Sequence, residues 1–309
     1  MRKAADFVEA SRADARADAA ATTDTQAQAD GTSLADDARA DAAAARPASS
    51  SLGRVAAIAR NAFREAVRDR VLYNLVLFVI LLTAGAVFLG ELSAAQEAKI
   101  IVDMGLSAML LFGVFISIFV GVGLVYKEIE RRTLYAIFSK PVGRGEFLVG
   151  KYLGLCLTLA VNVAVMGAGV SLALMFVRGG WEPLALSIWP AVALIYLELM
   201  VVVAVAILFS SFSSPALSAL LTFAAFVIGH FSADLKAFAA TLGSSGARLF
   251  FDALYYLLPN LSHYAYIADA AYGETPTTAA FFAAALYTLA YSSVLLAAAT
   301  LIFSRRNFK

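Results

Sequence analysis

The chain has 309 residues, of which 61% are hydrophobic and 15% charged, and its mean hydropathy is +0.77. This composition excludes an ordinary water-soluble domain and predicts an all-α integral membrane protein. One cysteine, Cys156, and two histidines far apart argue against a disulfide or a metal centre, and the net charge of +1 indicates no nucleic-acid partner, so we expect no bound cofactor or metal.

Residues 1–50 are almost free of large apolar side chains and consist mainly of Ala, Asp, Arg, Thr and Ser. The segment DARADAA occurs twice, at 14–20 and 37–43. No buried core can form from such residues, so we predict a disordered cytoplasmic tail. A regulatory or partner-binding arm is the functional alternative.

From Ser51 to Arg70 the pattern becomes that of an amphipathic helix. Apolar residues recur at helical spacing, while five arginines take the other side: Leu52, Val55, Ile58, Ala59, Ala62, Phe63, Ala66 and Val67 against Arg54, Arg60, Arg64, Arg68 and Arg70. We predict a helix lying in the membrane interface, with its arginines at anionic headgroups.

Residues 51–309 are predicted to form a permease-like domain with six spans, each near the roughly 20 residues that a bilayer requires. The expected spans are Val71–Leu89, Met104–Tyr126, Tyr152–Val177, Trp189–Phe209, Pro215–Phe231 and Ala279–Phe303. The short outer loops after the first and third spans carry one cation each, Lys99 and Arg178, and the positive-inside rule then places both termini in the cytoplasm. Serines of the short link 210–215 can satisfy backbone groups where the chain turns.

The most charged stretch is the cytoplasmic loop 127–151, between the second and third spans. Lys127 to Ser139 can form a helix of about three turns, which Pro141 ends. One interpretation is a charged loop that anchors two spans. The other is a docking surface for a soluble partner.

The residues of this loop carry a resemblance. The pattern E-x-x-T-L followed by S-K-P-V-x-R-x-E-F-L-x-G-K-x-L-G resembles type 2 ATP-binding cassette (ABC-2) permeases, most closely the branch associated with multi-copper enzyme maturation. The matching residues are Glu130, Thr133, Leu134, Ser139, Lys140, Pro141, Val142, Arg144, Glu146, Phe147, Leu148, Gly150, Lys151 and Gly154. In that family the loop is a coupling helix that rests in a groove of the ATPase subunit.

The resemblance implies roles for individual residues. The expected contacts to the ATPase are Glu128, Glu130, Arg131, Arg132 and Thr133. The expected anchors of the loop are Pro141, Arg144 and Lys151, the last two at lipid headgroups.

One motif in this region is misleading. Gly145 to Lys151 satisfies G-x-x-x-x-G-K, the start of a phosphate-binding P-loop, but Tyr152 stands where Ser or Thr must hold magnesium. The sequence also offers no preceding strand. We therefore expect no ATPase in this chain, with ATP and Mg²⁺ bound by a separate subunit.

The outer segment 232–278, between the fifth and sixth spans, is too long for a simple turn. Arg248 to Leu258 is apolar and aromatic, Pro259 and Asn260 interrupt it, and a second piece follows. Several tyrosines suit the headgroup zone: Tyr255, Tyr256, Tyr264, Tyr266 and Tyr272. The segment is either an interfacial cap or, as in the resembled exporters, a re-entrant helical pair.

Glu198 lies near the middle of the fourth span, where a carboxyl group needs a proton, a partner or water. It is either a pathway residue, or a neutral acid bonded to a neighbouring span with Asn162 as candidate partner. Asn74, Asn162 and His230 are interpreted mainly as polar contacts between helices.

The sequence thus predicts the transmembrane subunit of an ABC transporter, most simply a bacterial exporter in the inner (plasma) membrane. By the resemblance, two permease subunits work with two ATPase subunits in the lipid bilayer. The alternatives are a self-contained secondary transporter or channel that uses Glu198, and a membrane scaffold without transport. No residue indicates the substrate.

Overall fold

The computed structural model describes residues 51–68, 77–78, 81, 85, 96–130, 143–180, 183–241 and 245–305. All of them belong to a compact unit from Ser51 to Lys309. The described residues form helices and no strand, in agreement with the predicted all-α class. The expected tail 1–50, most of the first span and the middle of the coupling segment lie outside the described residues.

Four helical stretches of the described part are long and apolar enough to cross a membrane. They are Glu97–Gly123 in α4 (Glu97–Glu130), Gly145–Arg178 in α6 (Arg144–Arg178), Leu184–Ser210 in α7 (Leu184–Ser187) with α8 (Trp189–Ser210), and Thr278–Ser304 in α13 (Thr278–Arg305). They coincide with the second, third, fourth and sixth predicted spans. The fifth corresponds to α9 (Pro215–His230), whose 16 residues reach only about 24 Å.

The helices α4 and α6 begin earlier than predicted. With 34 and 35 residues they are each about 50 Å long, well beyond the roughly 30 Å hydrocarbon core. At the start of α4, Lys99 is helical rather than in a loop, and its Nζ lies 3.6 Å from the centroid of the Tyr272 ring. At the start of α6, Glu146 accepts a hydrogen bond from the Gly143 N–H at 3.2 Å and so fixes the first turn.

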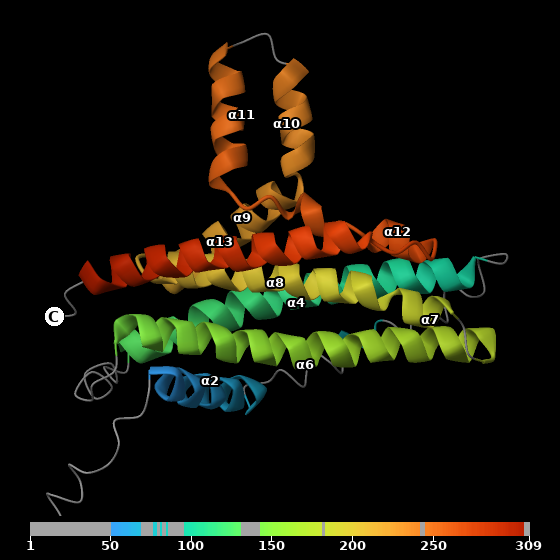
Figure 1. Cartoon of the computed structure of the whole chain (residues 1–309), viewed down its shortest axis with the longest axis horizontal. Helices are drawn as coiled ribbons and strands as arrows, with labels where there is room; N and C mark the ends of the chain where they lie inside the picture. The colour runs from blue at the N-terminus through green and yellow to red at the C-terminus, as the bar shows by residue number, and fades with distance from the viewer. Residues whose placement is uncertain are drawn as a thin grey trace, which may run out of the picture. The chain divides into compact units, whose positions relative to one another are not determined.

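The helix α8 is the centre of the bundle, packed against α4, α6, α9 and α13 (Figure 1). Most of its residues are buried, as expected for a helix that is apolar on all sides. The short link after α8 follows the prediction for its serines. The Ser211 and Ser213 hydroxyls donate to the carbonyls of Leu208 and Phe209 at 2.6 and 2.9 Å.

The outer segment, predicted as either an interfacial cap or a re-entrant helical pair, is largely helical in its described residues. It contains α10 (Ser232–Thr241), α11 (Ser245–Leu257), a 3₁₀ turn η1 (Leu261–Tyr264) and α12 (Ile267–Ala271). Figure 1 shows α10 and α11 side by side as a hairpin whose axes run across those of α8 and α13. The turn η1 packs back onto α8 and α9.

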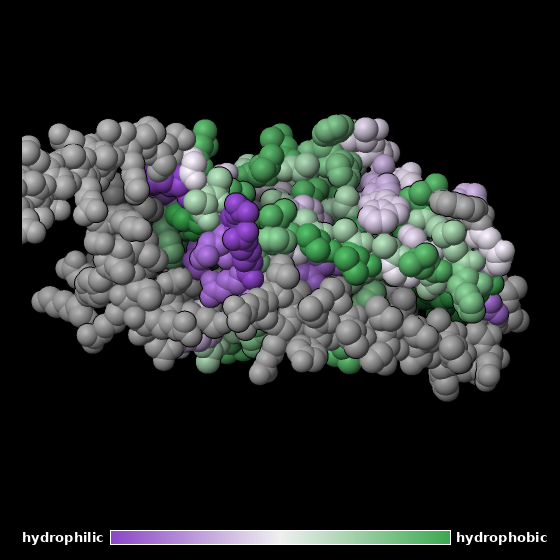
Figure 2. Space-filling model, turned by 90° about the horizontal axis from the view of Figure 1, so that it is seen from below, coloured by the Kyte–Doolittle hydropathy of each residue, from purple (hydrophilic) through white to green (hydrophobic). Residues whose placement is uncertain are grey.

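The predicted amphipathic helix is present as α2 (Ser51–Arg68), but its apolar side lies against α6 rather than being directed only at lipid. Within that side, Ala62 is completely buried. Arg60 and Arg64 are exposed on the opposite side of the helix. Figure 2 shows a hydrophilic area over α2. The amphipathic pattern therefore has a protein partner that the sequence did not reveal.

Candidate functional site

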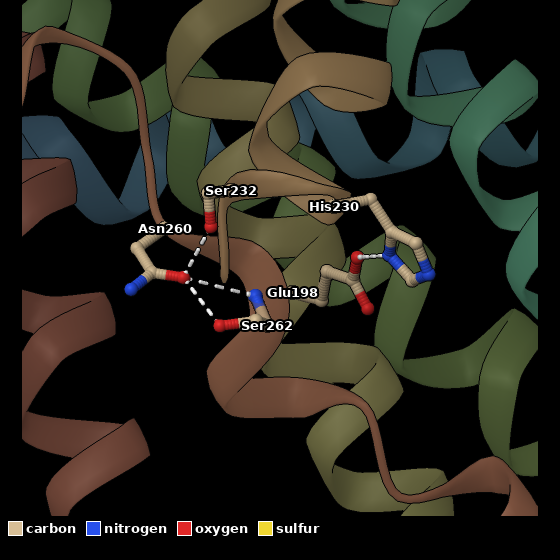
Figure 3. A network of polar contacts seen from close by, with 5 residues as sticks. All are labelled: Glu198, His230, Ser232, Asn260 and Ser262. Carbon is tan, nitrogen blue, oxygen red and sulfur yellow. Dashed lines mark hydrogen bonds and ion pairs between the residues drawn. The ribbon is translucent and has the colours of Figure 1, made fainter. Parts of the chain in front are cut away.

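Glu198 is the one charged residue of α8, and its side chain is only 1% exposed. Its Oε1 lies 3.4 Å from Nδ1 of His230, the last residue of α9 (Figure 3). The expected partner, Asn162, instead donates from Nδ2 to the carbonyl of Thr158 at 2.8 Å, within α6. The prediction of Asn162 as the partner of Glu198 is therefore wrong, because its amide bonds its own helix.

The partner could have been found from the length of the link between the two helices. Because residues 211–214 form a tight connection, α8 and α9 must run antiparallel. Glu198 in α8 and Val227 in α9 are the same number of residues from the middle of that link. Glu198 should therefore lie opposite Val227, which is within one helical turn of His230. The sequence analysis grouped His230 with general interhelical contacts and did not make this count.

The pair can hold a single proton in a largely apolar setting. The His230 ring centroid lies 5.8 Å from that of Phe226 and 5.7 Å from that of Phe231, and the side chain keeps 31% exposure. With one proton shared, the pair is either an ion pair or two bonded neutral groups. Without that proton Glu198 would be a buried carboxylate with a neutral neighbour, which is costly. The arrangement ties the middle of α8 to the end of α9.

A second polar centre lies beside the first, at Asn260 (Figure 3). Its Oδ1 accepts hydrogen bonds from the Ser232 hydroxyl at 2.6 Å, and from the N–H and hydroxyl of Ser262 at 3.2 and 2.6 Å. Its Nδ2 donates to the Tyr255 hydroxyl at 3.1 Å, and its backbone N–H donates to the Tyr287 hydroxyl at 2.9 Å. One side chain thus joins α10, α11 and η1, next to the contact with α13.

Tyr264 differs from its prediction. It was expected in the headgroup zone, but it is 1% exposed and its hydroxyl lies 2.6 Å from that of Thr288. Because the Thr288 hydroxyl donates its one proton to the carbonyl of Ala284 at 2.9 Å, Tyr264 must be the donor in the first bond. This bond fastens η1 to α13.

Among the buried side-chain atoms of the described residues, Asn162 Oδ1 has no hydrogen-bond partner. In a hydrocarbon environment such a group requires water, a ligand or another part of the protein. The role of Asn162 in a pathway stays a prediction. No group of three or more His, Cys, Asp or Glu side chains that could hold a metal comes together in the part of the chain that the structure describes.

Most of the residues assigned to the coupling helix cannot be placed. Arg131, Arg132, Thr133 and Pro141 lie outside the described residues, and only the backbone of α4 is described at Glu128 and Glu130. Their roles stay predictions.

The two cations after them lie in α6. Arg144 is the first residue of this helix. Lys151 is 2% exposed, and its Nζ lies 3.3 Å from Glu65 Oε2 because α2 covers it, whereas headgroup contact was expected. The P-loop-like segment Gly145–Lys151 is helical throughout rather than a loop.

The sequence of this chain is similar to a known protein family and to two named proteins. A family model described as "ABC-2 family transporter protein" matches residues 56–308. A protein named as a probable ABC transporter permease, NosY of Pseudomonas aeruginosa, is 29% identical over 122 residues, 38% of this chain and 44% of that protein. NosY of Stutzerimonas stutzeri, named in the same way, is 28% identical over 124 residues, with 38% and 45% coverage.

The alignments therefore span less than half the length of these two curated relatives. The family match is much longer, and it includes α4, α6, α8, α9 and α13 in full. With the long apolar helices of the bundle, it confirms the resemblance drawn from the loop motif. The chain belongs to the ABC-2 family of transporter proteins.

Proposed function

We propose that this chain is the permease subunit of an ATP-binding cassette transporter, moved by a separate ATPase subunit and working as an exporter. The observation that carries the proposal is the family match over residues 56–308, which takes in every long apolar helix described here. Two relatives named as probable ABC transporter permeases support it. ATP and Mg²⁺ would bind the ATPase subunit.

In this account the chain crosses the bacterial cytoplasmic membrane six times, with both termini in the cytoplasm. Two permease subunits enclose the pathway. Residues 131–142 join α4 to α6, and the coupling segment 127–151 that contains them is where the ATPase acts. Closure of the ATPase subunits around ATP pushes this segment, and the movement passes into α4 and α6. Both are about 50 Å long, so they extend beyond the hydrocarbon core and can receive that push outside the membrane.

The alternatives from the sequence are less well supported. Family membership favours movement driven by ATP over an ion-driven carrier that uses Glu198. The contact between Glu198 and His230 gives that carboxyl group a partner within the protein. Neither alternative has an observation of its own in the described structure.

The coupling contact can be tested by charge removal at the end of α4. We expect Glu130→Ala with Arg131→Ala to weaken binding of the ATPase subunit roughly ten- to a hundredfold, because a hydrogen bond to a charged group contributes about 1.5–3 kcal/mol. Permease-dependent stimulation of ATP hydrolysis in proteoliposomes should fall accordingly. Glu97→Ala with Lys99→Ala removes the same kinds of charge at the opposite end of α4 and should leave hydrolysis unchanged. Equal hydrolysis in both variants would remove the assignment of Glu130 and Arg131.

A further inference from the structure

The helix α2 and the first turns of α6 meet in register. Arg54 donates to both carboxylate oxygens of Glu146, from Nη2 at 2.7 Å and from Nε at 2.9 Å. One turn further along both helices, Ile58 lies over Gly150, and one turn beyond that Ala62 lies over Gly154. Each residue of α6 follows its partner in α2 by the same number of positions, so the two helices run in the same direction.

The glycines allow the two backbones to come close. A Cβ added at Gly150 would lie 2.7 Å from the Cβ of Ile58, and one at Gly154 would lie 2.6 Å from both the Cβ of Ala62 and the carbonyl oxygen of Ala59. No larger side chain fits without separating the helices. The small residues of α6 therefore form a seat for α2.

Two charge pairs also join α2 to α6. Lys151 is buried, its Nζ lies 3.3 Å from Glu65 Oε2, and the Phe147 ring centroid is 5.8 Å away. A buried ammonium group is costly unless it is paired, and Glu65 supplies such a partner from α2. In the other pair, the hydrogen bond to Glu146 raises the pKa of Arg54 above its ordinary value.

Glu146 also marks the start of α6. Its Oε2, which accepts from Arg54, accepts from the Gly143 N–H at 3.2 Å as well. Gly143 directly follows the connection 131–142. One carboxylate thus links the end of that connection, the beginning of α6 and the helix α2.

We infer that α2 and α6, joined along the first three turns of α6, form one rigid lever, through which a movement of the connection 131–142 reaches the chain that follows α2. Arg54, Glu65, Glu146 and Lys151 are positioning residues of this lever, and Gly150 with Gly154 is its seat. The inference rests on the proposed function, because the ATPase subunit supplies the movement. It also gives the E-F-L-x-G-K-x-L-G motif a role inside the chain.

Distances between pairs of spin labels can test whether the lever moves as one body. The full-length chain with Cys156→Ser, in complex with its ATPase subunit in nanodiscs, would carry labels at Ala57→Cys and Leu172→Cys, two exposed sites on α2 and α6 about 35 Å apart along the common direction. A reference pair joins Ala57→Cys to Leu289→Cys on α13. Between the nucleotide-free and the vanadate-trapped state, we expect the first distance to stay constant while the reference distance changes.

A change in the first distance as large as that in the reference would overturn the inference. So would constancy of both distances in a complex that hydrolyses ATP, because no movement would then pass through the lever. Absence of an ATPase subunit from the purified complex would count against the proposed function instead.

The charge pairs are tested on the permease alone, without the ATPase subunit. We expect Arg54→Gln with Glu65→Gln to broaden the distribution of the Ala57–Leu172 label distance. Arg60→Gln, on the exposed side of the same helix, serves as the matched control and should leave the distribution as in the parent. An unchanged distribution in the double variant would show that the pairs do not hold the lever.

Discussion

At the scale of the residue, the contact with His230 gives the buried carboxyl group of Glu198, in the middle of α8, a polar partner. We expect His230→Leu to destabilise the protein by about 3 kcal/mol, because it leaves a buried carboxyl group without its partner. Replacing both groups, with Glu198→Met and His230→Leu, should restore much of that loss, since no buried charge remains. Thermal unfolding in detergent measures both variants.

The other histidine of the chain gives the matched control. His263 is exposed, with its ring 5.5 Å from the centroid of the Tyr287 ring, so His263→Leu should change the unfolding temperature little. If the double variant were less stable than His230→Leu, the pair would not be the reason for the loss.

Asn260 carries a second prediction at this scale. Asn260→Leu removes the acceptor shared by Ser232 and Ser262, and each donor left unsatisfied costs about 1–3 kcal/mol. We expect faster amide exchange throughout α10 and α11. Asn260→Asp keeps the acceptor, and the Tyr255 hydroxyl can turn to donate, so exchange should stay near that of the parent. Similar exchange in both variants would mean that Asn260 does not organise the segment.

The sequence identified Glu198 as a costly group but not its partner. A hydropathy profile identifies apolar segments that will be buried, so it shows that the carboxyl group of Glu198 lies within such a segment. Partners depend on how helices are aligned, which follows here from the link between α8 and α9. Lys151 shows the same limit, since its motif was visible while its partner, Glu65, lies in a different helix.

At the scale of the element, the contact between α2 and α6 gives a steric prediction. Gly154→Ala places a methyl group against Ala62 and the backbone of Ala59, and we expect a loss of about 1–3 kcal/mol of stability with faster amide exchange in α2. Gly123→Ala is the matched control, because among the described residues no atom outside the surrounding backbone of α4 lies within 4 Å of a Cβ at that position. It should be neutral or stabilising by about 0.5–1 kcal/mol. Equal amide exchange in α2 for the two variants would show that Gly154 is not needed for the packing of α2 on α6.

Helix type was predictable from the apolar runs, while helix ends were not. The start of α6 lies eight residues before the predicted Tyr152 because Glu146 caps it and α2 supports its first turns. Its end is fixed by Gly179 at φ 70°, where a glycine accepts the left-handed conformation. Capping and packing set these boundaries, and neither contributes to hydropathy.

At the scale of the whole molecule, one loop motif indicated the family, and the family match over residues 56–308 confirms it. The described helices confirm the all-α class, and four of them are long and apolar enough to cross a membrane, against six predicted spans. The number of spans, the orientation and the assembly with an ATPase depend on a bilayer and on partner subunits. They stay predictions from charge distribution and from the family.

The most direct measurement is purification of the tagged full-length chain in a gentle detergent, with identification and quantification of the proteins bound to it. We predict one ATPase subunit per permease, carrying a complete G-x-x-x-x-G-K-[ST] P-loop, and its loss when Glu130 and Arg131 are replaced by Ala. A stable permease that purifies without any ATP-hydrolysing subunit from its native membrane would contradict the account.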